Sequence, residues 1–400
     1  MLLVLGVLHE NGAVRVDLEL VRRWSAMGVS AKVFALQRAK ADQAVAAPAT
    51  VSVNLGSASG RRLRHAWPII LWRLIAASRR AHVVVSGSEL GVALFFSFVA
   101  ARVARRPFAL LVHSRPSKAM ADWTPRWQHR AVRWIHRHSD GVACVSDRIV
   151  TDLVSAGVPA DVIRVVPNGI DIDTVRRLAN EAPAVARSPT SRTVVAVGRL
   201  SQEKGFDLLI RAHGLLRDAG AVSHRIVLLG DGPDRDKLAN LADRLGVGES
   251  VVFAGFVANP LPDIASADLL CMPSRYEGFP LVLLEALALG VPVIASPSGG
   301  ELLDEGSYGI VVPSESPECL ASAIAQHLRN PAPLRTLAAR GPERLRGYDW
   351  ATVAAHHLAW LRELAGVVES KDRAVPNRDS VQRSTNREAC GEPTGRHAND

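Results

Sequence analysis

The chain has 400 residues, of which 48% are hydrophobic and 22% charged, and its net charge is +9 at pH 7. This length exceeds that of one typical hydrophobic core, so two domains are expected, and the composition argues against a disordered or fibrous chain. The four cysteines lie far apart without a C-x-x-C pair, which argues against structural zinc, a redox dithiol and a secreted disulfide framework (Cys144, Cys271, Cys319 and Cys390).

The first part of the chain alternates short β-branched runs with segments of helical period, which predicts βαβ units and a parallel sheet. Residues 1–8 lack the basic segment of a signal peptide and indicate a first buried strand, so we expect a cytoplasmic protein. Residues 91–104 are apolar but too short to span a membrane, and they predict a core helix. The expected strands are residues 2–7, 32–36, 82–86, 108–112, 141–145 and 163–166.

The alternation pauses over residues 173–192, which are polar and contain no predicted strand, and it then restarts. We therefore expect a second doubly wound α/β sheet, with a ligand bound between the two sheets at the carboxyl ends of their strands. The second set of expected strands is residues 193–197, 225–229, 251–253, 268–272, 292–295 and 310–312.

The domain organisation follows from this alternation. Helical spacing over residues 350–364 predicts a last helix that packs back on the first domain, and the residues after it lack apolar periodicity and are expected to be disordered. The predicted divisions are an N-terminal Rossmann-like domain at 1–172 completed by a helix at 349–366, a linker region at 173–192, a C-terminal Rossmann-like domain at 193–348 and a disordered tail at 367–400.

The most informative motif covers residues 274–285, with the sequence SRYEGFPLVLLE. It follows a predicted strand and enters a helix whose expected first residue is Pro280. The free amides at such a helix start bind phosphate, and here they belong to Gly278, Phe279 and Leu281. Glu285 lies farther along the helix, where a carboxylate can accept hydrogen bonds from a ribose diol, and Glu277 lies where a sugar would sit.

A second motif, residues 197–205 with the sequence VGRLSQEKG, follows the first strand of the second domain. Arg199 and Lys204 can converge on one diphosphate across this strand-to-helix loop. In sugar transfer the departing diphosphate gains negative charge, so fixed cations there lower the barrier. The alternative for the two cations, and for Glu277 and Glu285, is ordinary surface charge.

These two motifs resemble those of the retaining glycosyltransferases of family 4, which have the GT-B fold of two Rossmann-like domains. The resemblance covers about residues 1–365 and implies that Arg199 and Lys204 hold the diphosphate, Glu285 the ribose, and Glu277 with the following amides the donor sugar. It also implies a front-face mechanism that retains the anomeric configuration and needs no metal or other cofactor. Phe256, after a strand of the second domain, would lie near the base.

Two residues of the first domain match the family's pattern. His113 follows a predicted strand and matches a histidine beside the transferred sugar, although such a residue can also be an ordinary buried polar group. Gly12 lies in the predicted loop after the first strand and matches a glycine that lets the backbone approach the donor phosphate. The family usually shows Ala-Glu-Arg after its glycines, whereas this chain reads Ala13-Val14-Arg15.

Basic charge is concentrated in the first part of the chain. Residues 1–172 contain 23 Lys and Arg against 11 Asp and Glu, whereas the remainder contains 25 against 28. Tryptophans are interleaved with the basic clusters, which favours a peripheral site on the anionic inner face of the cell membrane over solvated charge alone. Nucleic acid is disfavoured because no recognised binding module accompanies the charge.

The sequence thus predicts a retaining hexosyltransferase that moves a sugar from a nucleoside diphosphate sugar, with uridine favoured, to a lipid-linked or saccharide acceptor in cell-surface glycan synthesis. The alternatives are a nucleotide-sugar epimerase of the same fold and a non-catalytic nucleotide-sugar-binding protein. An NAD-dependent oxidoreductase is disfavoured because neither predicted domain carries G-x-G-x-x-G after its first strand.

Overall fold

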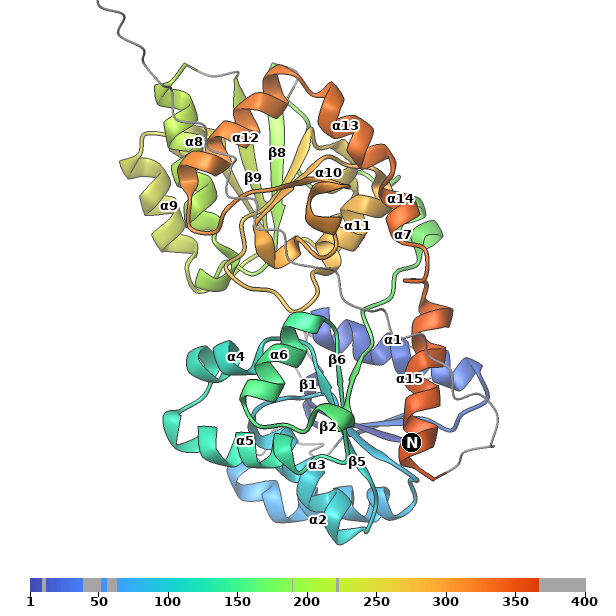
Figure 1. The fold of residues 1–400 in the computed structure, drawn as a ribbon. Helices are drawn as coiled ribbons and strands as arrows, with labels where there is room; N and C mark the ends of the chain where they lie inside the picture. Colours follow the sequence, from blue (N-terminus) through green and yellow to red (C-terminus); the bar gives the residue numbers. More distant parts are fainter. Residues whose placement is uncertain (9–11, 39–51, 56–62, 189, 221–222, 367–400) are drawn as a thin grey trace, which may run out of the picture. The chain divides into compact units, whose positions relative to one another are not determined.

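The apolar runs of the first part of the chain form one parallel sheet in the computed structural model, which describes residues 1–8, 12–38, 52–55, 63–188, 190–220 and 223–366. The predicted tail at 367–400 lies outside the described residues. The order of the described strands is β3-β2-β1-β4-β5-β6-β7 (Figure 1). They are β1 (Leu2–Leu8), β2 (Lys32–Arg38), β3 (Ser52–Leu55), β4 (Val84–Ser86), β5 (Phe108–Val112), β6 (Gly141–Cys144) and β7 (Ile163–Val165).

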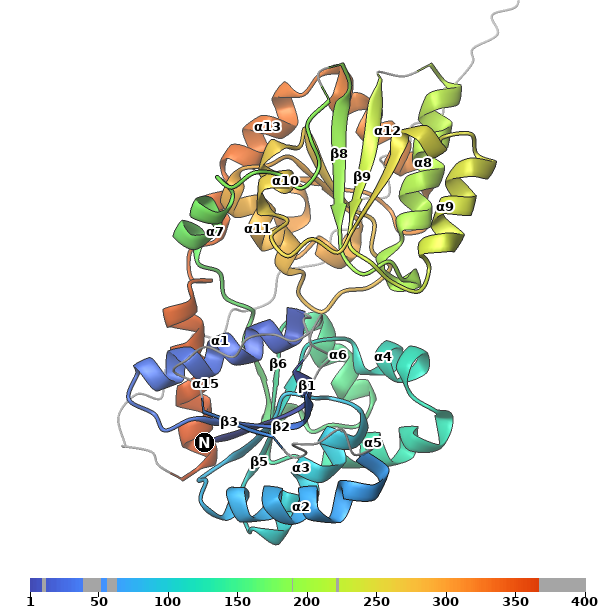
Figure 2. The same ribbon diagram turned by 180° about the vertical axis from the view of Figure 1, so that it is seen from behind.

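Helices cover both faces of this sheet, which explains why its central strands β1, β4, β5 and β6 are mostly continuous apolar runs rather than alternating ones (Figures 1 and 2). All five residues of β5 are buried, for example. The helices that follow its strands are α1 (Gly12–Ala26), α2 (Leu63–Arg79), α3 (Gly91–Val103), α4 (Pro116–Trp123), α5 (His129–Arg137) and α6 (Asp147–Ser155).

The sequence-based prediction missed β3, and it placed the start of β4 two residues too early. β3 is a four-residue strand that pairs with β2, and its sequence, SVNL, has polar residues at alternate positions. So short and polar a run lacks the apolar signal on which strand prediction depends. The predicted helix at 91–104 is observed as α3, and its buried residues include Leu94 and Phe98.

The second sheet is also parallel, and its described strands have the order β10-β9-β8-β11-β12-β13. They are β8 (Arg192–Val197), β9 (His224–Leu229), β10 (Val251–Gly255), β11 (Leu269–Met272), β12 (Val293–Ala295) and β13 (Ile310–Val311). The helices of this part are α8 (Phe206–Asp218), α9 (Arg235–Arg244), α10 (Leu261–Ser266), α11 (Leu281–Leu289), α12 (Pro317–Arg329), α13 (Ala332–Ala339) and α14 (Gly341–Arg344).

The segment expected to be a linker region begins with a helix, α7 (Ile172–Leu178). Asp171 caps this helix, because its side chain accepts a hydrogen bond from the backbone N–H of Thr174 at 3.0 Å. Asp263 accepts the backbone N–H groups of Ala184 and Val185 at 2.9 Å, which fixes the chain farther along this segment. Specific hydrogen bonds thus hold this segment at Thr174 and at Ala184 and Val185, which polar composition alone did not indicate.

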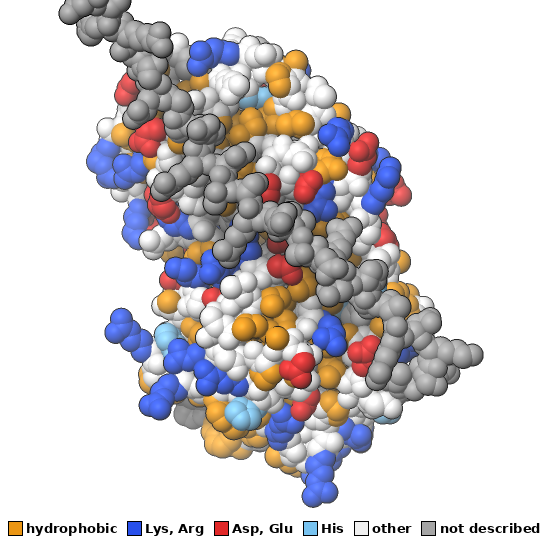
Figure 3. All heavy atoms as spheres, viewed as in Figure 1, with side chains coloured by type: hydrophobic (Ala, Val, Ile, Leu, Met, Phe, Trp, Pro, Cys, Tyr) orange, Lys and Arg blue, Asp and Glu red, His pale blue; other side chains and the backbone are white. Residues whose placement is uncertain are grey.

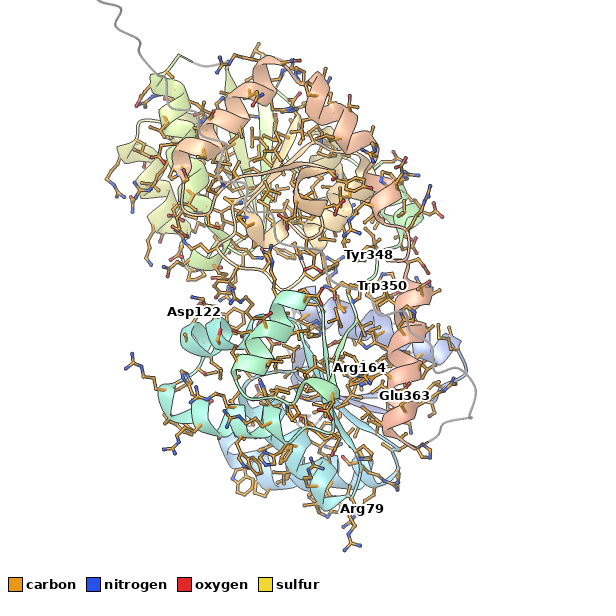
Figure 4. All side chains as sticks on the ribbon, viewed as in Figure 1. Arg79, Asp122, Arg164, Tyr348, Trp350 and Glu363 are labelled. Carbon is orange, nitrogen blue, oxygen red and sulfur yellow. The ribbon has the colours of Figure 1, made fainter. Side chains whose placement is uncertain are left out.

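The last helix, α15 (Trp350–Leu364), packs beside α1, as both ribbon views show (Figures 1 and 2). Trp24 of α1 donates its indole N–H to the carbonyl of Ala354 at 3.2 Å, although 330 residues separate the two. Tyr348 and Trp350 lie next to each other where α15 begins (Figure 4). Tyr348 stacks on Phe279 with ring centroids 5.7 Å apart, so this turn touches the segment before α11.

Each sheet reverses its strand order once, and such a switch point is where ligands bind in open α/β sheets. The switch point of the first sheet lies between β1 and β4, and that of the second lies between β8 and β11. The segments that follow β8 and β11 are the two motifs that the sequence singled out. The topology therefore brings them to neighbouring positions.

Candidate active site

Two segments of the second sheet meet at its switch point, residues 198–205 after β8 and residues 273–280 after β11. The backbone N–H of Arg275 donates to the carbonyl of Glu203 at 2.8 Å. Gly205 has φ of 65°, and a Cβ at this position would lie 2.2 Å from the carbonyl oxygen of Pro273. A left-handed backbone conformation and this close approach both require glycine. The segment ending at Gly205 is thereby held against the end of β11.

An ion pair joins the two motifs. The Lys204 ammonium donates to both carboxylate oxygens of Glu277, at 2.7 and 2.9 Å, and Ser274 donates its hydroxyl to the same carboxylate at 2.7 Å. The side chains of Lys204 and Glu277 are 25% and 11% exposed, so water screens the pair only in part. Two of the predicted site residues are therefore in direct contact.

Arg199 is exposed, and its side chain makes no hydrogen bond or ion pair with any residue that the structure describes. The backbone next to it is fixed by the turn after β9, since Leu200 donates its N–H to the carbonyl of Asp231 at 3.0 Å and accepts the N–H of Asp234 at 2.9 Å. The main chain around the predicted cation is thus anchored, but its side chain makes no hydrogen bond or ion pair with Lys204 or Glu277.

The segment before α11 differs in one detail from the prediction. The helix begins at Leu281, and Pro280 is the N-cap residue instead of the first helical residue. The backbone N–H groups of Gly278, Phe279 and Leu281 find no acceptor among the described residues. Unpaired amides at a helix start, together with the helix dipole, favour an anion there. Asn168 stabilises this turn, because its side-chain amide donates a hydrogen bond to the carbonyl of Phe279 at 3.1 Å.

Gly278 lies against the end of β5. A Cβ at this position would come 1.7 Å from the carbonyl oxygen of His113 and 2.7 Å from its carbonyl carbon, distances that no side chain can occupy. This close approach joins the motif after β11 to the predicted histidine of the first sheet. It is the most direct contact between the predicted site residues of the two sheets.

His113 is held at two points. Its ring nitrogen Nε2 bonds the Asp17 carboxylate of α1 at 2.9 Å, and its backbone N–H donates to Glu89 at 2.7 Å. Burial lowers the pKa of His113, but the Asp17 carboxylate and its hydrogen bond outweigh burial and raise that pKa above its usual 6.5. The neighbouring Ser114 donates its backbone N–H and its hydroxyl to Glu89.

Glu285 lies on α11, and its side chain makes no hydrogen bond with a described residue. Burial raises the pKa of its carboxyl to about 7, and the positive charge of Arg15 on α1 acts in the opposite direction. Glu285 can therefore change its charge near neutral pH.

The last two predicted residues lie at element ends. Gly12 is the first residue of α1 instead of a loop residue, and a Cβ there would lie 3.5 Å from Leu281 of α11. Phe256 follows β10 and is 60% exposed. Its ring is available for stacking, which is what a base would require.

Sequence reasoning missed Asp17, Glu89 and Ser274 and gave no role to Asn168. Asp17 lies on the buried face of α1, where an acidic residue breaks the apolar period of Val14, Leu18 and Val21. That break in the pattern was the available signal. Glu89 gave no signal, because only the fold brings it to the end of β5.

Two parallel sheets covered by helices, with the candidate site at the ends of their strands, are the architecture of the GT-B fold. A family model described as Glycosyltransferase Family 4 matches residues 10–174, and one described as Glycosyl transferases group 1 matches residues 191–330. The chain belongs to this glycosyltransferase family.

Individual relatives agree with the family assignment. The chain is 35% identical over 238 residues to the GDP-mannose-dependent alpha-(1-6)-phosphatidylinositol monomannoside mannosyltransferase of Mycolicibacterium smegmatis, covering 55% of this chain and 60% of the relative. It is 30% identical over 295 residues to the 2-deoxystreptamine glucosyltransferase of Streptomyces kanamyceticus, covering 67% and 72%. The first of these alignments thus spans less than two thirds of the relative's length.

A solved structure shares the fold. Anabaena HepE in complex with UDP and glucose has a TM-score of 0.74 at 21% identity, and the superposition covers 90% of this chain and 98% of HepE. The fold predicted from the sequence is confirmed.

Proposed function

We propose that this protein is a retaining glycosyltransferase that moves a hexose from a nucleoside diphosphate sugar to a lipid-linked or saccharide acceptor without a bound metal. The observation that carries the proposal is the meeting of Lys204, Glu277 and the unpaired amides before α11 at one switch point. A cation and bare N–H groups suit a pyrophosphate, and a neighbouring carboxylate suits sugar hydroxyl groups.

In the proposed reaction the bond between the anomeric carbon and the donor phosphate breaks, and the acceptor oxygen bonds the same face of that carbon. The acceptor's proton passes to the departing phosphate oxygen, and the anomeric configuration is retained. Lys204, together with the helix amides and Arg199, stabilises the charge that develops on the diphosphate. Before the donor binds, Lys204 is compensated by Glu277.

The nucleoside base of the donor sugar can be identified by thermal unfolding. The sequence favoured uridine, whereas one relative is named for GDP-mannose and HepE was solved with UDP. Thermal unfolding should be followed with UDP- and GDP-sugars, because a ligand that binds only the folded state raises Tm. Products formed with the best donor then separate three outcomes. Transfer to an added acceptor supports the proposal, conversion of the donor alone indicates an epimerase, and binding without any product indicates a non-catalytic protein.

Donor binding should weaken as pH falls from 8 to 6. Glu285 has a carboxyl pKa of about 7 and is the proposed ribose acceptor, so at pH 6 most of it is protonated and the carboxylate that would accept the hydroxyl protons is lost. We expect Kd to rise about tenfold over this range, following the ionised fraction. Calorimetric titration of Glu285→Gln should give a weaker Kd that changes little with pH. An unchanged pH dependence in this variant would assign the titration to another group.

We further propose that the first sheet's helices dock on an anionic membrane, where the enzyme would meet a lipid-linked acceptor. Among the described residues no helix is long and apolar enough to cross a bilayer. Trp72 of α2 is 69% exposed and Trp127, between α4 and α5, is 78% exposed. Figure 3 shows Lys and Arg side chains gathered over α4 and α5. Aromatic rings and cations on one surface suit the headgroup region of anionic lipid.

Vesicle sedimentation tests this docking. The protein should pellet with vesicles that contain phosphatidylglycerol and remain in solution with phosphatidylcholine alone. Reversing the charge of Arg126 and Arg130 should weaken binding at least tenfold, since each surface cation contributes about 1 kcal/mol. Arg244→Glu, an exposed change on α9, is the matched control and should bind like the wild type. Equal binding to both kinds of vesicle would refute the docking.

A further inference from the structure

A buried carboxylate lies behind His113. Asp17 is fully buried on α1, and the His113 ring is the one described side chain that bonds it. Its second oxygen, Oδ2, has no hydrogen-bond partner among the described residues and packs against Gly87, where a Cβ would come within 2.2 Å of it. Burying a carboxylate with so few partners costs stability, and an apolar residue would fill this position at lower cost.

The hydrogen bond from Asp17 decides which ring nitrogen is left for a ligand. Nε2 of His113 is engaged by the carboxylate, and Nδ1 has no partner among the described residues. The backbone on either side is fixed as well, because Glu89 accepts the His113 N–H and Gly278 packs on the His113 carbonyl. The ring therefore has one defined orientation, and its Nδ1 is buried without a hydrogen-bond partner among the described residues.

We propose that Asp17 is a positioning residue, which holds the His113 ring through Nε2 so that Nδ1 donates a hydrogen bond to a hydroxyl of the transferred sugar. This inference rests on the proposed function. A carboxylate bound to Nε2 favours the doubly protonated ring, in which both nitrogens are donors. A neutral ring bonded to Asp17 would leave Nδ1 as an acceptor only.

Three titratable groups face His113 from the elements packed against it. Asp17 on α1 and Glu89 before α3 both raise the pKa of His113. His357 on α15 is the third, and burial lowers its pKa to about 3, so it stays neutral and does not compete for the proton. Glu89 is held by Ser114 and by backbone N–H groups, so it should be unchanged when Asp17 is replaced.

The test begins with the His113 ring in the absence of any sugar. NMR titration of the protein should show an elevated His113 pKa in the wild type, with ¹⁵N shifts of a protonated Nδ1 at pH 6. In Asp17→Asn that pKa should fall by about one unit or more, because the charged partner is lost. Glu19→Gln, which removes a partly buried partner of Arg22 and Arg23 on the same helix, should leave it unchanged. The wild-type shifts test the proposal even if Asp17→Asn fails to fold.

Kinetics then test whether Asp17 acts through His113. Asp17→Asn should lower kcat roughly 10- to 100-fold with little change in the donor KM, as loss of a positioned hydrogen-bond donor does. In a His113→Ala background the same change should cause no further loss. Additive losses, or a His113 titration that does not respond to Asp17, would overturn the proposal. A responsive titration in a protein that transfers no sugar would instead overturn the proposed function.

Discussion

Replacing Lys204 with alanine should lower kcat/KM for the nucleotide sugar about 100- to 1,000-fold. The variant loses the ammonium that we assign to the diphosphate, and removal of one such charge-stabilising group costs roughly 3–4 kcal/mol in the transition state. It also leaves the Glu277 carboxylate, 11% exposed, without its cation, so repulsion between two negative groups adds to the loss. Steady-state kinetics with the donor identified by thermal shift would measure the change.

Two controls separate this effect from a general loss of charge. Lys237→Ala removes a lysine that is 81% exposed and paired with Asp234 on the same domain, and it should leave the rate unchanged. Lys204→Arg keeps the charge but alters its geometry, and it should recover part of the activity. Tm of Lys204→Ala without ligand should fall below that of the wild type, because Glu277 loses its cation, so the kinetics should be measured below that Tm. A donor KM and kcat like those of the wild type would remove Lys204 from the site.

Gly278→Ala should lower turnover about 100-fold or more. The added Cβ would lie 1.7 Å from the His113 carbonyl oxygen, so either the turn before α11 or the end of β5 must move. The end of β5 is fixed by its neighbouring strands and by Glu89, so the turn that presents the amides is the part that shifts. A misplacement of about 1 Å at a reacting centre can cost a hundredfold in rate.

A glycine elsewhere on the same domain provides the matched control. Gly214 lies inside α8, and a Cβ there would make ordinary contacts of 3.5–3.9 Å with Leu245. Gly214→Ala should therefore keep full activity and raise the stability slightly, since alanine favours a helix. If both glycine variants were fully active, the close approach between Gly278 and His113 would have no role in turnover.

The sequence predicted the sheet strands well where the strands were buried on both faces. Such strands are continuous apolar runs bounded by helices, and β5 was predicted without error in its bounds. The short polar strand β3 and the capped helix α7 were missed because each is stabilised by pairing or capping rather than by apolar content. Pro280 was placed one residue too far into its helix, within the usual uncertainty of helix ends.

The residues of the candidate site that lie within the two sequence motifs could be predicted, whereas those that only the fold brings together could not. Lys204 and Glu277 could each be assigned to a loop beside the donor, because parallel strands on either side of a switch point end side by side, but their ion pair was not predicted. Asp17 could not be assigned to His113, since 96 residues separate them and only the packing of α1 on the sheet brings them together. Arg199 was predicted to converge with Lys204 on a diphosphate, yet its side chain is exposed and makes no hydrogen bond or ion pair with a described residue.

A crystal structure with a bound nucleoside diphosphate would test most directly whether Lys204 and the amides before α11 bind the diphosphate. We expect phosphate density within hydrogen-bond distance of the Lys204 ammonium and of the backbone N–H groups of Gly278 and Phe279, with the ribose hydroxyls against Glu285. Density for the diphosphate elsewhere, with the pair of Lys204 and Glu277 undisturbed, would contradict it.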